Sequence, residues 1–274
     1  MWYNRAISFL LLCLTAGAVY AAEGLPLPDA DSLEALRPVE KSFTFEVGAN
    51  SLADTYLSPL RYKGTSFAIS YERQQAMRFD PRRWNMRLSA RVSLADTQNP
   101  ARNADIWNLN GHLDWSMRRI WSLPLGFSAG VGGGASLNLG CLYSTRNGNN
   151  PASAKAAFTV DLAGFGQWRG SLWRLPLTVR YQPSLPLLGC FFSPEYGQLY
   201  YEIYMGDNDN LAHFAHFGNY FALENLFTVD VRFGKTSVRL GYRGDILSTK
   251  VNNITSRDIS HAFIIGITTR WISI

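Results

Sequence analysis

The chain has 274 residues, of which 47% are hydrophobic and 17% are charged, and its formal net charge is +5. The mean hydropathy is -0.08, so apolar residues are dispersed among polar ones, and beyond the N-terminus no run approaches the ~20 apolar residues that a spanning helix needs. The mild, scattered positive charge argues against a nucleic-acid-binding protein, which would cluster Lys and Arg.

The N-terminus has the organisation of an export signal. Arg5 precedes a short apolar stretch, and small residues up to Ala21 offer a cleavage site. We therefore expect a signal peptide over residues 1–21, a proline-containing periplasmic leader over 22–40, and the folded domain over 41–274. The alternative is a retained N-terminal helix, which the shortness of the apolar stretch disfavours.

Apolar and polar residues then alternate, as they do in strands whose side chains point to opposite faces. In chain order the alternating segments fall at 43–50, 66–72, 84–94, 107–117, 124–138, 155–168, 172–182, 227–233, 236–246 and 263–271. These ten segments are close to the length that crosses a membrane as a strand.

The ninth segment shows the pattern clearly, because Leu240 and Tyr242 share one parity and Arg239, Arg243 and Asp245 share the other. A soluble β-sandwich would also alternate. However, arginines opposed to acids on the polar parity, and tryptophans towards segment ends, favour an antiparallel outer-membrane β-barrel. On this interpretation Leu240→Arg hinders membrane assembly and Arg239→Gln is tolerated much better. The charges that we expect inside the barrel are Glu46, Arg87, Arg91, Asp114, Arg180, Asp230, Arg232, Arg239, Arg243, Asp245 and Arg270.

The connections alternate in length, with short ones after the even-numbered segments and long ones after the odd-numbered segments. This asymmetry is typical of short periplasmic turns and long extracellular loops. The longest connection, 185–223, resembles a hairpin around a Gly/Asn/Asp-rich turn. We expect ten spanning strands, because the stretch Tyr200–Met205 is short for a crossing; twelve strands are the alternative.

Two of the connecting stretches carry a family resemblance: 138–151 (NLGCLYSTRNGNNP) and 185–202 (LPLLGCFFSPEYGQLYYE). Together with the shorter pieces 54–60, 240–245 and 260–263, they resemble an uncharacterised family of exported Bacteroidota proteins, defined by a domain of unknown function with a predicted outer-membrane barrel. The resemblance implies an outer-membrane location and supplies no catalytic or binding residues.

One weak catalytic set is present, because His112, Asp114 and Ser116 share the inward parity of one strand. Residues two apart on a strand are roughly 7 Å apart, so these side chains line up without automatically touching. Polar packing of the barrel interior is the favoured interpretation. We expect no metal site and no cofactor.

The two cysteines of the expected mature chain, Cys141 and Cys190, form an even pair in an oxidising compartment. A disulfide and two unpaired thiols are equally compatible with their spacing.

Aromatic residues gather in the longest connection. Those that we expect at an outer-loop surface for a ligand or partner are Phe191, Phe192, Tyr196, Tyr200 and Tyr201. The alternative is packing of the loop on itself.

The sequence thus predicts an outer-membrane barrel of unresolved role, more in keeping with a non-enzyme, acting through extracellular loops or a narrow polar interior. A lipid-modifying hydrolase and a selective small-solute channel are the alternatives. The expected partners are outer-membrane lipid and, during biogenesis, the barrel-assembly machinery; no nucleic acid is expected, and the sequence names no ligand or protein partner.

Overall fold

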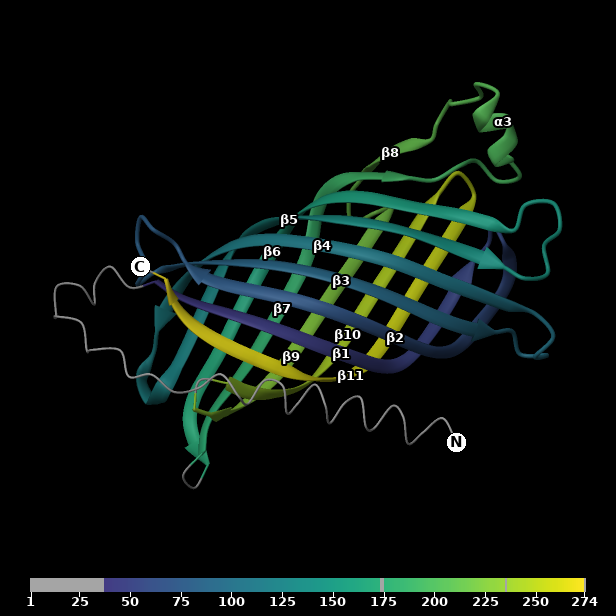
Figure 1. Ribbon diagram of the computed structural model, residues 1–274. Coiled ribbons are helices and arrows are strands. Elements are labelled where there is room, and N and C mark those ends of the chain that lie inside the picture. The colour runs from purple at the N-terminus through teal and green to yellow at the C-terminus, as the bar shows by residue number, and fades with distance from the viewer. Residues whose placement is uncertain (1–36, 173–174, 235, 274) are drawn as a thin grey trace. The chain divides into compact units, whose positions relative to one another are not determined.

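The computed structural model describes residues 37–172, 175–234 and 236–273, whose strands form a closed antiparallel barrel (Figure 1). The strands are β1 (Arg37–Asp54), β2 (Ser58–Ala76), β3 (Trp84–Gln98), β4 (Asp105–Ser122), β5 (Phe127–Ser144), β6 (Ala152–Leu172), β7 (Leu175–Phe192), β8 (Ala212–Ala215), β9 (Tyr220–Phe233), β10 (Thr236–Val251) and β11 (Ile254–Ser273). Two short helices are described, η1 (Pro124–Gly126) and α3 (Tyr200–Tyr204). The expected signal peptide and residues 22–36 of the expected leader lie outside the described residues, whereas residues 37–40 belong to β1.

Ten of the strands make the ring. Each pairs with its neighbours in the order β6-β5-β4-β3-β2-β1-β11-β10-β9-β7, and the pairing of β6 with β7 closes the circle. β8 is not part of the ring, because it pairs only with the end of β7. The prediction of a ten-strand antiparallel barrel is confirmed, and the twelve-strand alternative is wrong.

The expected hairpin within the longest connection is not formed. Residues 200–204 are helical instead of extended, and the carboxylate of Glu202 accepts a hydrogen bond from the Leu199 backbone N–H at 2.7 Å, which caps the helix. Gly206, with φ of +108°, then turns the chain in a conformation that favours glycine. β7 and β9 extend over both ends of the expected 185–223 insertion, and residues 193–219, which we call the long segment, lie between them.

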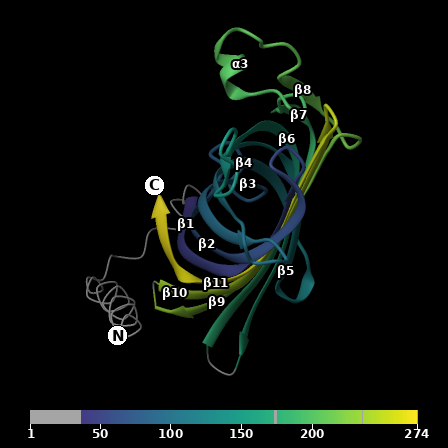
Figure 2. The ribbon, with the colours of Figure 1, turned by 90° about the vertical axis from the view of Figure 1, so that its right-hand side faces the viewer.

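The two ends of the barrel differ. At one, the turn end, lie the start of β1, the end of β11, and the connections after β2, β4, β6 and β9. At the other, the loop end, lie the connections after β1, β3, β5, β7 and β10. Figure 2, which faces the loop end, shows α3 and β8 of the long segment to one side of the ring.

Several stretches that the alternation assigns to loops are strands. β1 runs to Asp54 and β2 starts at Ser58, so three residues connect them, and β10 and β11 are joined through Asn252 and Asn253. The barrel wall therefore continues beyond the segments in which the inward side chains are polar. The alternation is hidden near the loop end because some inward residues there are apolar, such as Leu52 and Tyr62, and some outward residues are charged, such as Lys63 and Arg257.

The outward face of the ring is a belt of exposed apolar side chains and the inward face is polar. Phe45, Ile69 and Leu240 are exposed, whereas Glu46 and Arg239 are buried. An apolar outside and a polar inside are the reverse of the arrangement in a water-soluble protein, and they are the pattern of a transmembrane β-barrel. Across the described ranges, no helix has the length and apolar character to cross a bilayer.

Candidate functional site: the barrel interior and the loop end

A network of ion pairs fills the barrel interior towards the turn end. Arg239 donates from Nε to Asp230 Oδ1 at 2.7 Å and from Nη1 to Glu72 Oε1 at 3.0 Å. Arg180 pairs with Glu40, donating from Nη2 to Oε2 at 2.8 Å. Each of these charged groups is buried, so its desolvation must be offset by charge-assisted hydrogen bonds, and the chain supplies them.

The network continues through the middle of the barrel. Glu46 accepts from Arg91 Nε at 2.9 Å and from Arg243 Nε at 3.2 Å. Arg243 also pairs with Glu224, and Arg91 reaches Asp245 at 3.3 Å. Charges from β1, β3, β9 and β10 are thus joined in one cluster.

Some contacts span the whole bore. Gln74 of β2 donates to Gln182 of β7 at 3.1 Å, although these strands are five positions apart in the ten-strand ring. Arg87 of β3 and Glu224 of β9, also five positions apart, approach to 3.8 Å. Side chains of opposite walls therefore meet across the bore at these two levels.

Arg118 is almost fully buried, and no ion pair joins it to a carboxylate of the described residues. Its Nη1 donates to Gln182 at 2.8 Å and its guanidinium lies 4.9 Å from the centre of the Phe165 ring. Arg118 is opposite Gly132 in the β4–β5 register, and a Cβ at Gly132 would meet the Met117 carbonyl oxygen at 1.9 Å. The glycines of β5 therefore allow β4 and β5 to approach closely where this side chain turns inward.

A polar cavity of about 100 Å³ lies between this network and the loop end. Its lining includes Asn50, Asn110, His112 and Asp245, each of which has one buried polar atom without a hydrogen-bond partner in the described chain. Polar cavities of this kind hold water.

The catalytic candidates are not assembled. Asp114 accepts a hydrogen bond from Arg87 at 2.8 Å, and the hydroxyl of Ser116 is buried without a described partner. The nearest acid to His112 Nε2 is Glu224, at 3.8 Å. Since nucleophile, base and orienting acid must be joined by hydrogen bonds, this arrangement does not support nucleophilic catalysis.

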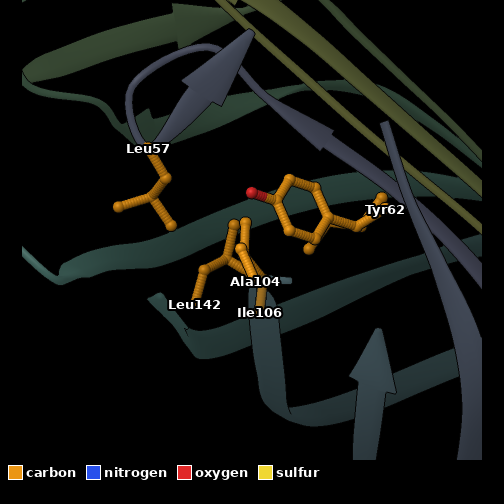
Figure 3. Close-up of a cluster of buried hydrophobic side chains, with 6 residues drawn as sticks. Leu57, Tyr62, Ala104, Ile106 and Leu142 are labelled. Atoms are coloured by element: carbon orange, nitrogen blue, oxygen red, sulfur yellow. The ribbon is translucent and has the colours of Figure 1, made fainter. Parts of the chain in front are cut away.

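An apolar cluster narrows the loop end of the interior (Figure 3). We call it the apolar cap; its residues are Leu52, Leu57, Tyr62, Ala104, Ile106 and Leu142. All are buried, and they come from β1, β2, β4, β5 and their connections. Hydrophobic side chains therefore line the interior at this end on the side of β1, β2, β4 and β5.

Tyrosines attach the long segment to the barrel rim. Tyr56, beside the apolar cap, donates to the Gln198 carbonyl at 2.7 Å and accepts a hydrogen bond from Asn150. Its ring meets that of Tyr200 edge-on at 6.0 Å, and Tyr200 Oη accepts from the Ala154 N–H at 2.6 Å. Burial raises the pKa of Tyr200 to about 12, so its hydroxyl stays protonated.

The rest of the long segment presents an exposed aromatic surface. Its exposed large side chains are Tyr196, Tyr201, Tyr204, Met205, Phe214 and Phe217. The segment has four acidic residues, Glu195, Glu202, Asp207 and Asp209, and no Lys or Arg. It is thus both apolar and negatively charged.

The structure distributes the expected aromatic surface differently. Tyr196 and Tyr201 are exposed, Phe192 and Tyr200 are half-buried, and Phe191 is buried. Phe191 was expected at the surface, and that expectation is wrong: β7 continues through it, so its ring packs on Tyr220 and His213. Met205 is exposed in the same surface although the aromatic pattern does not include it.

The expected interior charges lie on the inward face, and one of them is exposed. Arg232 shares the inward parity but lies at the turn end, where Nε donates to the Gly234 carbonyl at 2.9 Å. Two important acids were missed: Glu40, because the leader was expected to include it, and Glu224, because it lies between the expected long connection and the next alternating segment. Glu224 has the same parity as Asp230 on β9, and this is the signal that would have identified it.

Cys141 on β5 and Cys190 on β7 are both free thiols, and β6 separates their strands. The disulfide alternative is therefore not realised. Within the part of the chain that the structure describes, no group of three or more His, Cys, Asp or Glu side chains is placed to hold a metal ion.

Comparisons with known proteins identify a family and several structural resemblances. The sequence profile of the family "Protein of unknown function (DUF3316)" matches residues 7–274. No curated protein matches the sequence. Among solved structures, the chain resembles the outer membrane protease OmpT from Escherichia coli (7% identity, TM-score 0.47, 92% of this chain and 100% of that chain). It also resembles the translocator domain of the autotransporter NalP from Neisseria meningitidis (9%, 0.41, 98% and 96%) and a FadL homologue from Pseudomonas aeruginosa (8%, 0.32, 86% and 90%).

Proposed function

The chain belongs to the DUF3316 family of proteins of unknown function, and from its interior we propose that it is a non-conducting, non-catalytic outer-membrane barrel that presents the long segment at the cell surface. The observation that carries this proposal is the contact between opposite walls, Gln74 with Gln182 and Arg87 with Glu224. Buried side chains that meet from opposite walls at two levels leave little room for a diffusing solute.

The apolar belt and the polar interior support a location in a membrane, and the two unlike ends support a direction within it. Bacterial barrels of this class have short turns on the periplasmic side and longer connections outside. The loop end, with the long segment, would then face the medium, and the turn end would face the periplasm.

The working surface in this proposal is the exposed part of the long segment. Exposed aromatic side chains are enriched where proteins bind partners. Large exposed apolar patches on proteins mark interaction sites. The four acids without a compensating Lys or Arg favour a partner with basic side chains. We therefore propose a polypeptide with basic and apolar side chains as the partner.

A catalytic role has less support. Asp114 is engaged by Arg87, and no hydrogen bond links it to His112. A lipid-modifying hydrolase would need a nucleophile and a base in contact, and the described residues of the interior do not offer them.

Two measurements test the proposal. Purified, heat-modifiable protein in planar bilayers should show no single-channel conductance; stable channels would refute a closed barrel. An epitope inserted at Gly206, which is exposed in the long segment, should bind antibody on intact cells, whereas one inserted at Arg82 in the turn after β2 should require permeabilised cells. The reverse accessibility would refute the proposed direction.

A further inference from the structure

Four cations lie together on the outward face of the barrel near the loop end. We call them the basic cluster: Arg61, Lys63, Lys250 and Arg257, all exposed. They come from β2, β10 and β11, which with β1 are consecutive strands of the ring. The ladder between those strands therefore fixes their relative positions.

The register brings two arginines to the same level. Arg61 of β2 and Arg257 of β11 both lie opposite Ala53 of the intervening β1. Two strand spacings separate them, so their Cα atoms are roughly 10 Å apart. Lys63 is opposite Ser51, which is two residues nearer the apolar belt than Ala53. Both of these β1 residues have small side chains.

No carboxylate neutralises this cluster. None of its four members makes an ion pair with a described residue, and none is among the residues that have further contacts. The outward acid nearest in the register is Asp96 of β3, opposite Thr65, which is two residues along β2 from Lys63. Most buried arginines of the inward face pair with acids, whereas these four outward cations pair with none among the described residues.

The aromatic side chains of the apolar belt begin a few residues along the same strands from the cluster. On the same outward parity, Phe67 follows Lys63 by four residues, and Phe263 follows Arg257 by six. Both rings are exposed. At about 3.3 Å per residue, an anion held at Lys63 would be roughly 13 Å from Phe67, within the reach of one amphiphile.

We propose that the basic cluster binds the phosphate groups of a phosphorylated lipid whose acyl chains lie on the apolar belt. Arginine donors match the oxygens of phosphate, and cations beside a membrane surface attract anionic lipid headgroups. The position beside the belt selects a lipid over a soluble anion, because the same face contacts the acyl chains. This inference rests on the membrane location in the proposed function, but not on the closed bore or on the long segment.

The test compares lipid binding by the full chain, folded in an uncharged maltoside detergent, using native mass spectrometry. The probes are a bisphosphorylated glucosamine-disaccharide lipid and the same lipid without phosphates. Wild-type protein should prefer the phosphorylated probe, and Arg61→Gln with Arg257→Gln should weaken its binding about 25-fold, at about fivefold for each cation.

Arg102→Gln with Arg146→Gln is the matched control, because both arginines are exposed in connections at the loop end but lie outside the cluster. This control should bind the phosphorylated lipid like the wild type. Heat modifiability on gels reports folding of every variant, so a folding defect is distinguished from a lost site. Equal binding of the two lipids, equal weakening in both double variants, or displacement of the lipid by millimolar inorganic phosphate would overturn the proposal. Conductance or reversed epitope accessibility would instead contradict the proposed function.

Discussion

Replacing Arg239 with glutamine should destabilise the barrel about as much as placing arginine at Leu240 on its lipid-facing side. Arg239 is 2% exposed and its guanidinium contacts Asp230, Glu72 and Glu40. Removing one partner of a buried ion pair costs about 3–5 kcal/mol, because the remaining charge is left without compensation. The large difference between the two variants that the alternating pattern alone predicts should therefore disappear.

The expected value is near the lower limit of that range. Each of the three acids keeps a second cation: Asp230 keeps Arg180 at 3.3 Å and Glu72 keeps Arg87 at 2.8 Å, while Glu40 also retains Arg180. We therefore expect Arg239→Gln to lower the free energy of unfolding by about 3 kcal/mol.

The reference variant is Leu240→Arg. Leu240 is 39% exposed and lies opposite Ile265, which is opposite Phe45 near the middle of the apolar belt. Arginine on the lipid face of a barrel costs about 2–4 kcal/mol near the midplane. The two variants should thus be comparable, although one removes an arginine and the other adds one.

The assay is equilibrium urea unfolding in lipid vesicles, followed by tryptophan fluorescence. Arg232→Gln is the control: it removes an exposed arginine of the same parity and should change the free energy of unfolding by less than about 0.5 kcal/mol. Combining Arg239→Gln with Asp230→Asn should recover part of the lost stability, because the double variant removes one buried negative charge together with the positive one. If Arg239→Gln were as mild as Arg232→Gln, the reasoning about the buried network would be refuted.

Three further changes test other parts of the structure. Gly132→Ala should lower the free energy of unfolding by about 1–3 kcal/mol in the same urea assay, because its Cβ would collide with the backbone of β4, whereas Gly148→Ala, with no atom near the added Cβ, should have no such steric cost. Tyr56→Phe should speed proteolytic cleavage within the long segment severalfold without changing heat modifiability, since it removes the hydrogen bond to Gln198; unchanged cleavage would count against that attachment. His112→Ala should leave the envelope lipid composition unchanged in thin-layer and mass-spectrometric profiles, and an altered profile would reopen the hydrolase alternative.

The alternation identified the ring because it has one physical cause through most of each strand: lipid outside and buried charge inside. It failed near the loop end, where Leu52, Tyr62 and Ile106 point inward and are apolar. There each strand continues, but the difference between its two faces is lost, so the sequence alone predicts a loop. These residues are recognised as strand only from their pairing with neighbouring strands.

The interior charges were predictable as a class, but their partners were not. Parity places Arg87 and Asp245 inside, yet only the ring closure shows that Arg87 meets Glu224 from the opposite wall. Contacts across the bore depend on strand number and on the stagger of the strands, which one strand's sequence does not contain. The prediction that Phe191 is exposed was wrong for a related reason, since the direction of its side chain depends on where β7 ends.

The seam between β1 and β11 has a consequence for how the molecule forms. It pairs Arg37 with Ser273 and continues without interruption to Asp54 with Ser256. Its partners are more than 200 residues apart in the chain, so the entropic cost of joining them is met only after the intervening hairpins exist. Until that moment both strands are unpaired edges that invite pairing with other chains. We therefore expect barrel closure to be a late and vulnerable step of folding, and substitutions in the seam should affect assembly yield more than the stability of protein that has already closed.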